Sequence, residues 1–257
     1  MSNELGKVRR AQNMELMSGV HGTWSWDDFV DENLPSSTVR VPDDSAIELD
    51  GAHVSDWGKP GGGCGAEAIV CGGGIEAVVR AMQTNPHSVE VQEKGCGALQ
   101  KLAAAFQHTR ENQTRIASAG GIEVVVRAMQ ANPHSVEVQE KGCGALWSLA
   151  SSHAENQTRI ASAGGIEAVV RATQMDDQSA PVQEKGCGAL SNLVSSRTEY
   201  KIRIASAGGI MAILKAMQTH ENSTGVQEDG CRALLNFAYL QEDNTATIAS
   251  AGASRPR

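Results

Sequence analysis

The chain has 257 residues, with 22 Lys and Arg against 30 Asp and Glu, so its net charge is −8 at pH 7. No run of about 18 apolar residues occurs, so no membrane-spanning helix is expected, and the first 30 residues lack the apolar core of a secretory signal. The acidic balance also argues against an electrostatic nucleic-acid binder. With only three Phe, two Tyr and four Trp, the core is expected to be aliphatic, alanine-rich and helical.

Residues 1–63 form an acidic leader that holds 5 Lys and Arg against 11 Asp and Glu, whereas residues 64–257 hold 17 against 19. The leader lacks hydrophobic periodicity, and its excess charge and low apolar content predict disorder. Its segment TWSWDDFVDE groups Trp24, Trp26 and Phe29. These aromatic residues are either a short acidic docking motif or incidental residues of a disordered tail, and the composition favours the tail.

Residues 64–252 contain four sequence markers that recur in register. Gly-Gly-Ile begins at 73, 120, 164 and 208, in steps of 47, 44 and 44 residues. Val-Gln-Glu begins at 91, 138, 182 and 226, and Gly-Cys begins at 95, 142, 186 and 230. Ile-Ala-Ser-Ala-Gly ends at 120, 164, 208 and 252. The chain is therefore expected to contain four tandem copies at about 73–119, 120–163, 164–207 and 208–252, followed by a tail at 253–257.

Each copy is expected to form three helices. A short helix over 111–119, just before the second Gly-Gly-Ile marker, ends at Gly120, because glycine readily adopts a left-handed backbone just past a helix. The next helix carries an apolar stripe that runs from Ile122 to Met129 at helical spacing. Asn132-Pro133 ends that helix, and the proline can open the next one. The third helix, over about 136–150, is apolar on several sides and is expected to be buried between neighbours.

Helical copies of 44–47 residues cannot bury their apolar faces alone, so they are expected to stack into a solenoid, and their length is typical of HEAT or armadillo repeats. The ordered segments GGIEAVVRAMQ, VEVQEKGCGALQKLA and ENQTRIASAG resemble the armadillo repeat. This resemblance covers about residues 66–252 and implies an all-α, right-handed superhelix. It also implies that the third helices line a concave groove that binds an extended peptide or a partner protein.

The stripe opposite the buried Val and Leu residues of the third helices is the candidate groove surface, because positions i, i+3 and i+7 share a helix face. Amide side chains suit a peptide backbone because they both donate and accept hydrogen bonds. The alternative is a solvated face stabilised by Glu–Lys pairs. The predicted groove residues are Lys94, Gly97, Lys101, Lys141, Gly144, Ser148, Lys185, Gly188, Asn192, Arg232 and Asn236; Asp229 lies on the same stripe, and Glu93, Glu140, Glu184 and Glu228 border it.

Glycine pairs inside the third helices each carry a helix-propensity cost of about 1 kcal/mol per residue relative to alanine. The first glycine of each pair (Gly95, Gly142, Gly186) is expected to allow close helix packing. The second (Gly97, Gly144, Gly188) either does the same or leaves a flat groove floor. Nuclear import adaptors of the armadillo family carry a Trp ladder at these second positions, so import is not favoured; Trp147 is assigned to packing.

The repeat cysteines Cys96, Cys143, Cys187 and Cys231 occupy one structural position and are expected to be buried, reduced thiols. Cys64 and Cys71 form no zinc-binding pattern. His87 and His134 recur in loops and are expected to be exposed or capping. The weak dinucleotide-like glycine pattern at 63–68 follows no strand, so the sequence predicts neither an enzyme nor a cofactor or metal site.

The sequence therefore predicts a non-enzymatic protein–protein interaction scaffold in the cytoplasm or the nucleus. The alternatives are a regulatory fragment of a larger signalling protein and a trafficking adaptor of the nuclear-import or vacuolar-membrane type. Ser2, where N-terminal acylation would need glycine, does not favour membrane attachment. Partners are expected to be proteins or extended peptides. The last copy lacks a polar cap, which suggests end-to-end self-association.

Overall fold

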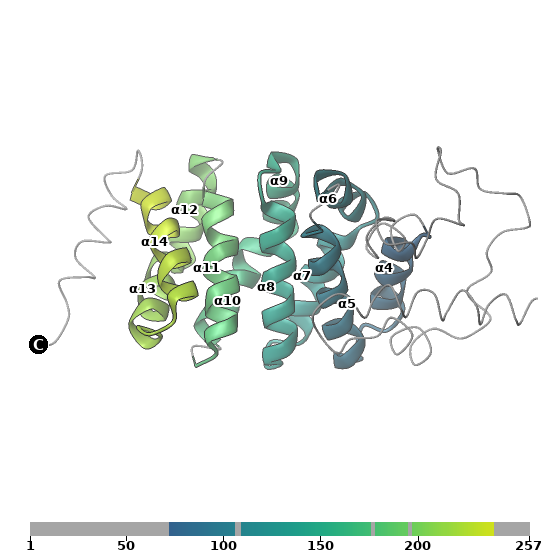
Figure 1. The fold of residues 1–257 in the computed structure, drawn as a ribbon, viewed down its shortest axis with the longest axis horizontal. Helices are drawn as coiled ribbons and strands as arrows, with labels where there is room; N and C mark the ends of the chain where they lie inside the picture. The colour runs from purple at the N-terminus through teal and green to yellow at the C-terminus, as the bar shows by residue number, and fades with distance from the viewer. Residues whose placement is uncertain (1–71, 106–108, 176–177, 195–196, 239–257) are drawn as a thin grey trace, which may run out of the picture. The chain divides into compact units, whose positions relative to one another are not determined.

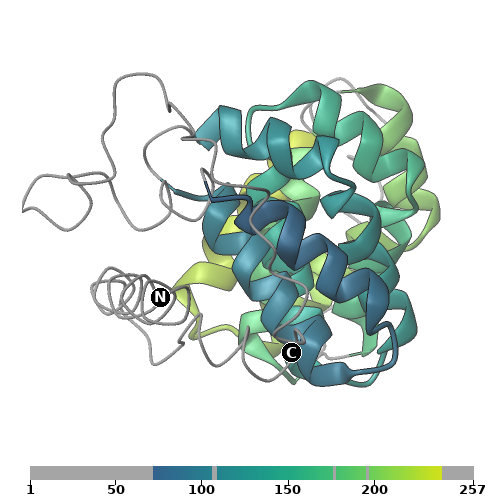
Figure 2. The ribbon, with the colours of Figure 1, turned by 90° about the vertical axis from the view of Figure 1, so that its right-hand side faces the viewer.

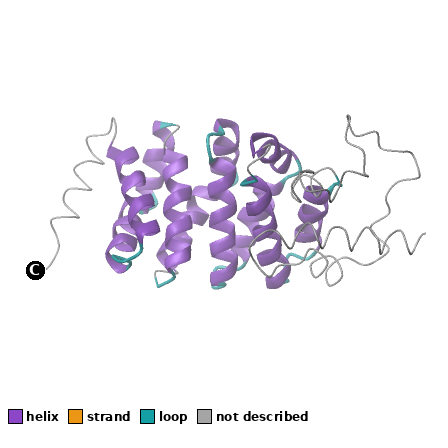
Figure 3. Cartoon of the chain, in the orientation of Figure 1, coloured by secondary structure: helices purple, strands orange, loops and turns teal. Residues whose placement is uncertain are grey.

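A computed structural model describes residues 72–105, 109–175, 178–194 and 197–238. The acidic leader with Trp24, Trp26 and Phe29, the cysteines at 64 and 71, and the tail at 253–257 lie outside the described residues. The chain divides into two compact units, Met1–Ala77 and Val78–Arg257. Every regular element among the described residues is an α-helix, as Figure 3 shows.

The helices fall into three classes that alternate along the chain. The first helices are α6 (Thr109–Ser118), α9 (Ala154–Ser162) and α12 (Thr198–Ser206). The second helices are α4 (Gly74–Thr84), α7 (Gly121–Ala131), α10 (Gly165–Met175) and α13 (Gly209–Thr219). The third helices are α5 (Val89–Ala103), α8 (Val136–Ala150), α11 (Ala180–Val194) and α14 (Thr224–Ala238). The predicted third helix over 136–150 is confirmed, and the predicted first helix over 111–119 begins two residues earlier, at Thr109.

Within the unit Val78–Arg257, the third helices pack against one another in chain order: α5 on α8, α8 on α11, and α11 on α14 (Figure 1). Figure 2, viewed along this row, shows the helices of successive repeats one behind another. Leu99, Leu146 and Leu190 occupy the same position in three third helices, and none is accessible to solvent. The repeats therefore share one continuous aliphatic core, as the sequence predicted.

The glycine of each Gly-Gly-Ile marker joins the first helix of a repeat to the second. Gly120, Gly164 and Gly208 have φ angles of 87°, 84° and 84°. This left-handed conformation is strained for residues with a Cβ and accessible to glycine. The chain can therefore change direction between two helices without a longer loop.

Serine begins the third helix in the first and second repeats. The hydroxyl oxygen of Ser135 accepts a hydrogen bond of 3.3 Å from the backbone N–H of Val138, and Ser88 caps α5 in the same way. Pro133 lies in the loop before this cap. The prediction that the proline opens the third helix is wrong here. A serine occupies the helix start, where its side-chain oxygen accepts a hydrogen bond from a backbone N–H, and a proline side chain has no such acceptor.

The glutamine of each Val-Gln-Glu marker joins the third helix to the end of the second. The amide nitrogen of Gln139 donates to the carbonyl oxygens of Met129 at 2.9 Å and Asn132 at 2.8 Å. Gln92 and Gln227 make corresponding pairs of bonds, and Gln183 donates to Thr173. These carbonyls would otherwise lack helical partners, so the marker is explained by the folding of each repeat.

Other marker residues connect one repeat to the next. Arg159 of α9 binds Glu123 of α7 through two N–O contacts of 2.6 and 3.1 Å, and Arg203 binds Glu167 similarly. The amide of Gln113 donates to the carbonyl of Ser148 at 2.7 Å, and Gln157 donates to Asn192 at 3.2 Å. These contacts fix the register in which the repeats stack.

The repeat cysteines differ at the last described repeat. Cys96, Cys143 and Cys187 are completely buried, as predicted, and all four repeat cysteines are free thiols. Burial raises the pKa of Cys96 to about 12; burial and the charge of Asp229 raise that of Cys187 to about 12. The prediction of burial is wrong for Cys231, which is exposed. Its counterparts lie beneath a following third helix, whereas α14 is the last third helix described.

Candidate functional site: the third-helix face

The predicted groove stripe runs across four neighbouring third helices, and we call this surface the third-helix face. Its predicted members with exposed side chains are Lys101 and Arg232; those partly exposed are Lys94, Gly97, Lys141, Ser148, Lys185, Asn192 and Asn236. Gly144, Gly188 and Asp229 are buried. Side chains of the preceding third helices cover Gly144 and Gly188, and Asp229 is bound by Arg232 of its own helix.

The first glycines of the third helices allow contact with the second helices. A Cβ placed on Gly142 would lie 2.5 Å from the Cγ of Met129, and Gly95 faces Met82 equally closely. Gly186 faces the methyl group of Thr173. The prediction that these glycines serve close packing is confirmed.

The second glycines accommodate a side chain of the preceding repeat. A Cβ on Gly188 would lie 2.7 Å from the ring of Trp147, and one on Gly144 would collide with the amide of Gln100. A Cβ on Gly97, by contrast, would have only the aliphatic part of Lys141 within 4 Å among the residues that the structure describes. Gly144 and Gly188 therefore serve packing between repeats, and the alternative of a bare groove floor remains only for Gly97.

Trp147 contributes to the third-helix face although it was not among the predicted site residues. The Nζ of Lys185 lies 5.1 Å from the centre of the indole ring, within the range of a cation–π interaction. Because the ring also covers Gly188, the assignment of Trp147 to packing between repeats is confirmed. The sequence could have revealed this contact only through the spacing between Trp147 and Gly188 in successive repeats. Using that spacing would have required knowing which positions of neighbouring third helices face each other.

The predicted amide residues bind the preceding third helix. The Nδ2 of Asn192 donates to the carbonyl oxygen of Trp147 at 3.1 Å, and that of Asn236 donates to Ser191 at 3.2 Å. Each bond joins residues 45 positions apart in the chain. These amides therefore fix neighbouring third helices, and their Nδ2 groups are engaged within the protein.

Basic residues of the third-helix face are paired with adjacent carboxylates. Lys141 lies 2.8 Å from Glu140, and Lys185 lies 2.6 Å from Glu184. Lys94 lies 3.9 Å from Glu93. All six side chains remain 24–37% exposed. The face therefore offers both signs of charge at each of the first three third helices.

A buried carboxylate distinguishes the α11–α14 end of the face. Arg232 binds Asp229 at 2.6 Å and Glu228 at 2.7 Å, and only 7% of the Asp229 side chain is exposed. Burial is the main cause that raises the pKa of Asp229 above its usual value of 3.8, and Arg232 opposes it. The nearby carboxylates of Glu184 and Glu228 raise this pKa further, while Lys185 lowers it.

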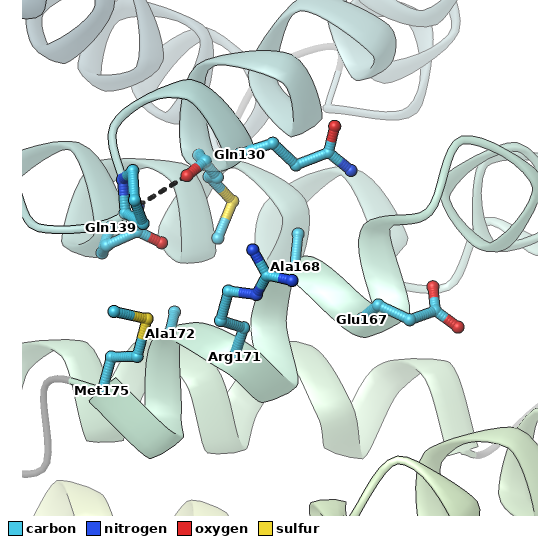
Figure 4. Close-up of a pocket in the computed structure, with 9 residues that line it drawn as sticks. Gln130, Gln139, Glu167, Ala168, Arg171, Ala172 and Met175 are labelled. Carbon is cyan, nitrogen blue, oxygen red and sulfur yellow. Dashed lines mark hydrogen bonds between the residues drawn. The ribbon is translucent and has the colours of Figure 1, made fainter.

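A small cavity lies elsewhere, between α7 and α10 (Figure 4). Its volume is about 210 Å³, which is below the usual 300–1,000 Å³ of a small-molecule site. Two of its polar residues are already engaged: Gln139 bonds to Met129, drawn as a dashed line, and Glu167 binds Arg203. We therefore do not assign the cavity a small-molecule ligand.

The described helices show two further absences. No group of three or more His, Cys, Asp or Glu residues among them is placed to hold a metal ion. No helix in the described ranges combines the length and the apolar character that crossing a membrane requires.

Comparisons with known proteins agree with this architecture. No protein-family model matches the chain, and no curated protein matches it. An engineered protein of known structure is 30% identical over 74% of this chain and 72% of its own, with a TM-score of 0.63. A designed armadillo repeat protein in complex with the peptide (KR)4 is 21% identical over 74% of each chain, with a TM-score of 0.62. Computationally designed armadillo repeat proteins for modular peptide recognition give 20% identity over 74% of this chain and 75% of theirs, with a TM-score of 0.63.

Proposed function

We propose that the chain, which has the fold of designed armadillo repeat proteins, is a non-enzymatic scaffold that binds an extended peptide segment of a partner protein on its third-helix face. The observation that carries this proposal is the row of paired charges, repeated at the same position of adjacent third helices. The similarity to armadillo proteins designed for peptide recognition supports it.

The spacing of the third helices suits an extended chain. Packed helices lie about 8–10 Å apart, and an extended peptide advances about 3.3 Å per residue. Each repeat would therefore contact about two or three peptide residues, and four third helices would contact a segment of roughly 8–10 residues. A regular peptide register can thus follow from the regular stacking of the repeats.

The charged pairs would recognise both the backbone and the side chains of such a peptide. Carboxylates of Glu140 and Glu184 can accept hydrogen bonds from peptide N–H groups, and the ammonium groups of Lys141 and Lys185 can donate to peptide carbonyls. Lys101 and Arg232 are the most exposed predicted members of the face. We expect them to contact peptide side chains because both are exposed on this face, although Arg232 also binds Glu228 and Asp229.

The same pairs favour a partner of mixed charge. One solved relative binds the peptide (KR)4. In this chain, the carboxylates of Glu140 and Glu184 are already within 2.8 Å of a lysine ammonium group. A purely basic peptide would have to displace these lysines, whereas a peptide that carries both signs could pair with each member. We therefore propose a mixed-charge segment.

A peptide-display selection on the full chain tests the proposal. Selected peptides should bind wild type and lose at least about tenfold in affinity, or 1.4 kcal/mol, in a Lys101→Glu, Lys141→Glu variant. The matched control is Arg127→Glu, Lys215→Glu, which makes the same charge change on the second helices α7 and α13. If the control weakens binding as much as the test variant, or if neither does, the third-helix face is not the site.

A further inference from the structure

The outward side of α14 differs from the corresponding sides of α5, α8 and α11. Leu235 is 70% exposed, whereas its counterparts Gln100 and Trp147 are partly covered and Ser191 is buried. Cys231 is also exposed, although the three other repeat cysteines are fully buried. We call the exposed side of α14 around Cys231 and Leu235 the terminal face.

The second helix of the same repeat also lacks the usual connecting charge. Met211 stands in the register where Glu123 and Glu167 bind an arginine of the following repeat. Its side chain is 54% exposed. An apolar residue therefore occupies the position that, in the earlier repeats, forms an ion pair with the following repeat.

The three internal junctions show what kind of surface fits the terminal face. At two of these junctions, the residue in the Leu235 register lies against the second-glycine position of the following third helix. Where the residue in the Leu235 register is large, the second-glycine position of the following helix holds glycine: Gln100 lies over Gly144, and Trp147 lies over Gly188. Where it is the small Ser191, the second position holds Arg232. By the same pattern, the large Leu235 should pack against a helix that carries glycine at its second-glycine position.

The chain itself carries such a helix. Among the described residues, only the aliphatic part of Lys141 lies within 4 Å of a Cβ placed on Gly97 of α5, so no described side chain of a preceding helix covers this second-position glycine. It is partly exposed, whereas Gly144 and Gly188 are buried. Both α5 and α14 contain 15 residues, so they match in length as the internal pairs do.

The position of Lys101 supports the same pairing. Lys101 occupies the register of Asn192 and Asn236, whose side chains donate to the backbone carbonyl of the preceding third helix. In a second copy, the ammonium group of Lys101 can donate to the carbonyl of Leu235 in the same manner. The side chain that should reach back across the junction is therefore a hydrogen-bond donor.

We propose that the terminal face of one copy binds α5 of a second copy, with Leu235 seated over Gly97, so that the chains associate head to tail. This contact continues the internal α5–α8, α8–α11 and α11–α14 interfaces across two molecules. Because the two surfaces differ, the interface is heterologous and can extend to further copies. The proposal is independent of peptide binding on the third-helix face.

Light scattering and sedimentation of the full chain over a range of concentrations test this association. Wild type should show a mass that increases with concentration, and Leu235→Lys and Gly97→Leu should each remain monomeric. The control Ile202→Lys replaces another exposed apolar residue, 54% accessible on α12, and should associate as wild type does. Circular dichroism of each variant verifies that the helices are retained.

A mixture of the two variants gives the decisive measurement. Leu235→Lys keeps an intact α5 and Gly97→Leu keeps an intact terminal face, so an equimolar mixture should form a dimer although neither variant associates alone. In wild type, alkylation of Cys231, followed by peptide mass spectrometry, should slow at high concentration. A strictly monomeric wild type, an association that survives Leu235→Lys, or a mixture that stays monomeric would overturn the proposal. A monomer in which Cys231 is protected at every concentration would also overturn it, because another segment of the same chain would then cover the terminal face.

Discussion

The α8–α11 and α11–α14 junctions have the same backbone arrangement but fill it with different side chains. In both, an asparagine of the later helix donates to a carbonyl of the earlier one, at 3.1 and 3.2 Å. At α8–α11, the large Trp147 of the earlier helix covers Gly188 of the later one. At α11–α14, the same two positions hold the small Ser191 in the earlier helix and the long Arg232 in the later one. The larger side chain therefore belongs to the earlier helix at one junction and to the later helix at the other.

The difference also changes the electrostatics of the two junctions. Lys185 lies over the indole ring of Trp147 and beside Glu184, so its charge is both paired and partly covered. At the next junction, the register of Lys185 holds Asp229, which is buried and binds Arg232. One register of the fold can therefore carry either sign of charge, provided that a neighbouring residue compensates it. The backbone contacts define the stacking, and the side chains at the second-glycine position are free to vary in pairs.

The largest expected effect comes from breaking this pairing at α8–α11. Gly188→Arg should destabilise the protein by about 2–3 kcal/mol, because its Cβ alone would lie 2.7 Å from the indole ring. Adding Trp147→Ser, which copies the α11–α14 arrangement, should recover at least about 1 kcal/mol relative to the sum of the single changes. Urea denaturation of the four members of this cycle measures the coupling. Strict additivity would show that the two positions do not exchange volume.

Gly97→Ala is the matched control for the cycle. Its new Cβ would meet only the Cγ and Cδ atoms of Lys141, both at 3.8 Å, which is ordinary van der Waals contact. Alanine is favoured over glycine by about 1 kcal/mol in a helix interior. The control should therefore leave the free energy of unfolding unchanged or raise it.

The second effect concerns what the two junctions share. Asn192→Ala removes the bond to the Trp147 carbonyl, and Asn236→Ala removes the bond to the Ser191 carbonyl together with a longer one, of 3.4 Å, to the Ser191 hydroxyl. Each change should lower the free energy of unfolding by about 0.5–1.5 kcal/mol. Because the two bonds to carbonyl oxygens have nearly equal lengths, the two losses should be similar. Thermal and urea denaturation of both variants provide the comparison. A loss confined to one junction would mean that the asparagines do not play the same part in both.

The sequence predicted the features that depend on local order along the chain. Glycine after the first helix, the apolar stripe of the second helix and the length of α8 all follow from spacing within one repeat. The recurrence of four markers then led to stacking, since an isolated repeat leaves its leucines exposed. These predictions required no knowledge of how far apart neighbouring helices lie.

The site was less predictable because its geometry depends on contacts about 45 residues apart. Nothing within the third helix of the third repeat shows that Asn192 turns towards Trp147, or that Gly188 lies beneath the indole ring. Both depend on the distance and rotation between two helices. Cys231 was misassigned for a related reason: its own helix matches the others, and its exposure reflects what lies beside α14.

The smallest expected effect distinguishes the junctions by pH. Burial raises the pKa of Asp229 above 3.8 in the folded protein, so the folded state holds its proton more tightly than the unfolded chain does. The contribution of this group to stability is therefore fully present below pH 3.8 and is lost as the pH rises through the folded pKa. Asp229→Asn stays neutral and should gain stability relative to wild type as the pH rises from below 3.8 through the folded pKa, with a plateau above it. Denaturation at a series of pH values measures this difference, in which titrations common to both proteins cancel. A constant difference would mean that the ion pair with Arg232 balances the burial of the carboxylate, and a difference that falls with pH would mean that the ion pair outweighs the burial. In either case the acidic residue at α11–α14 would be as well compensated as the lysine at α8–α11.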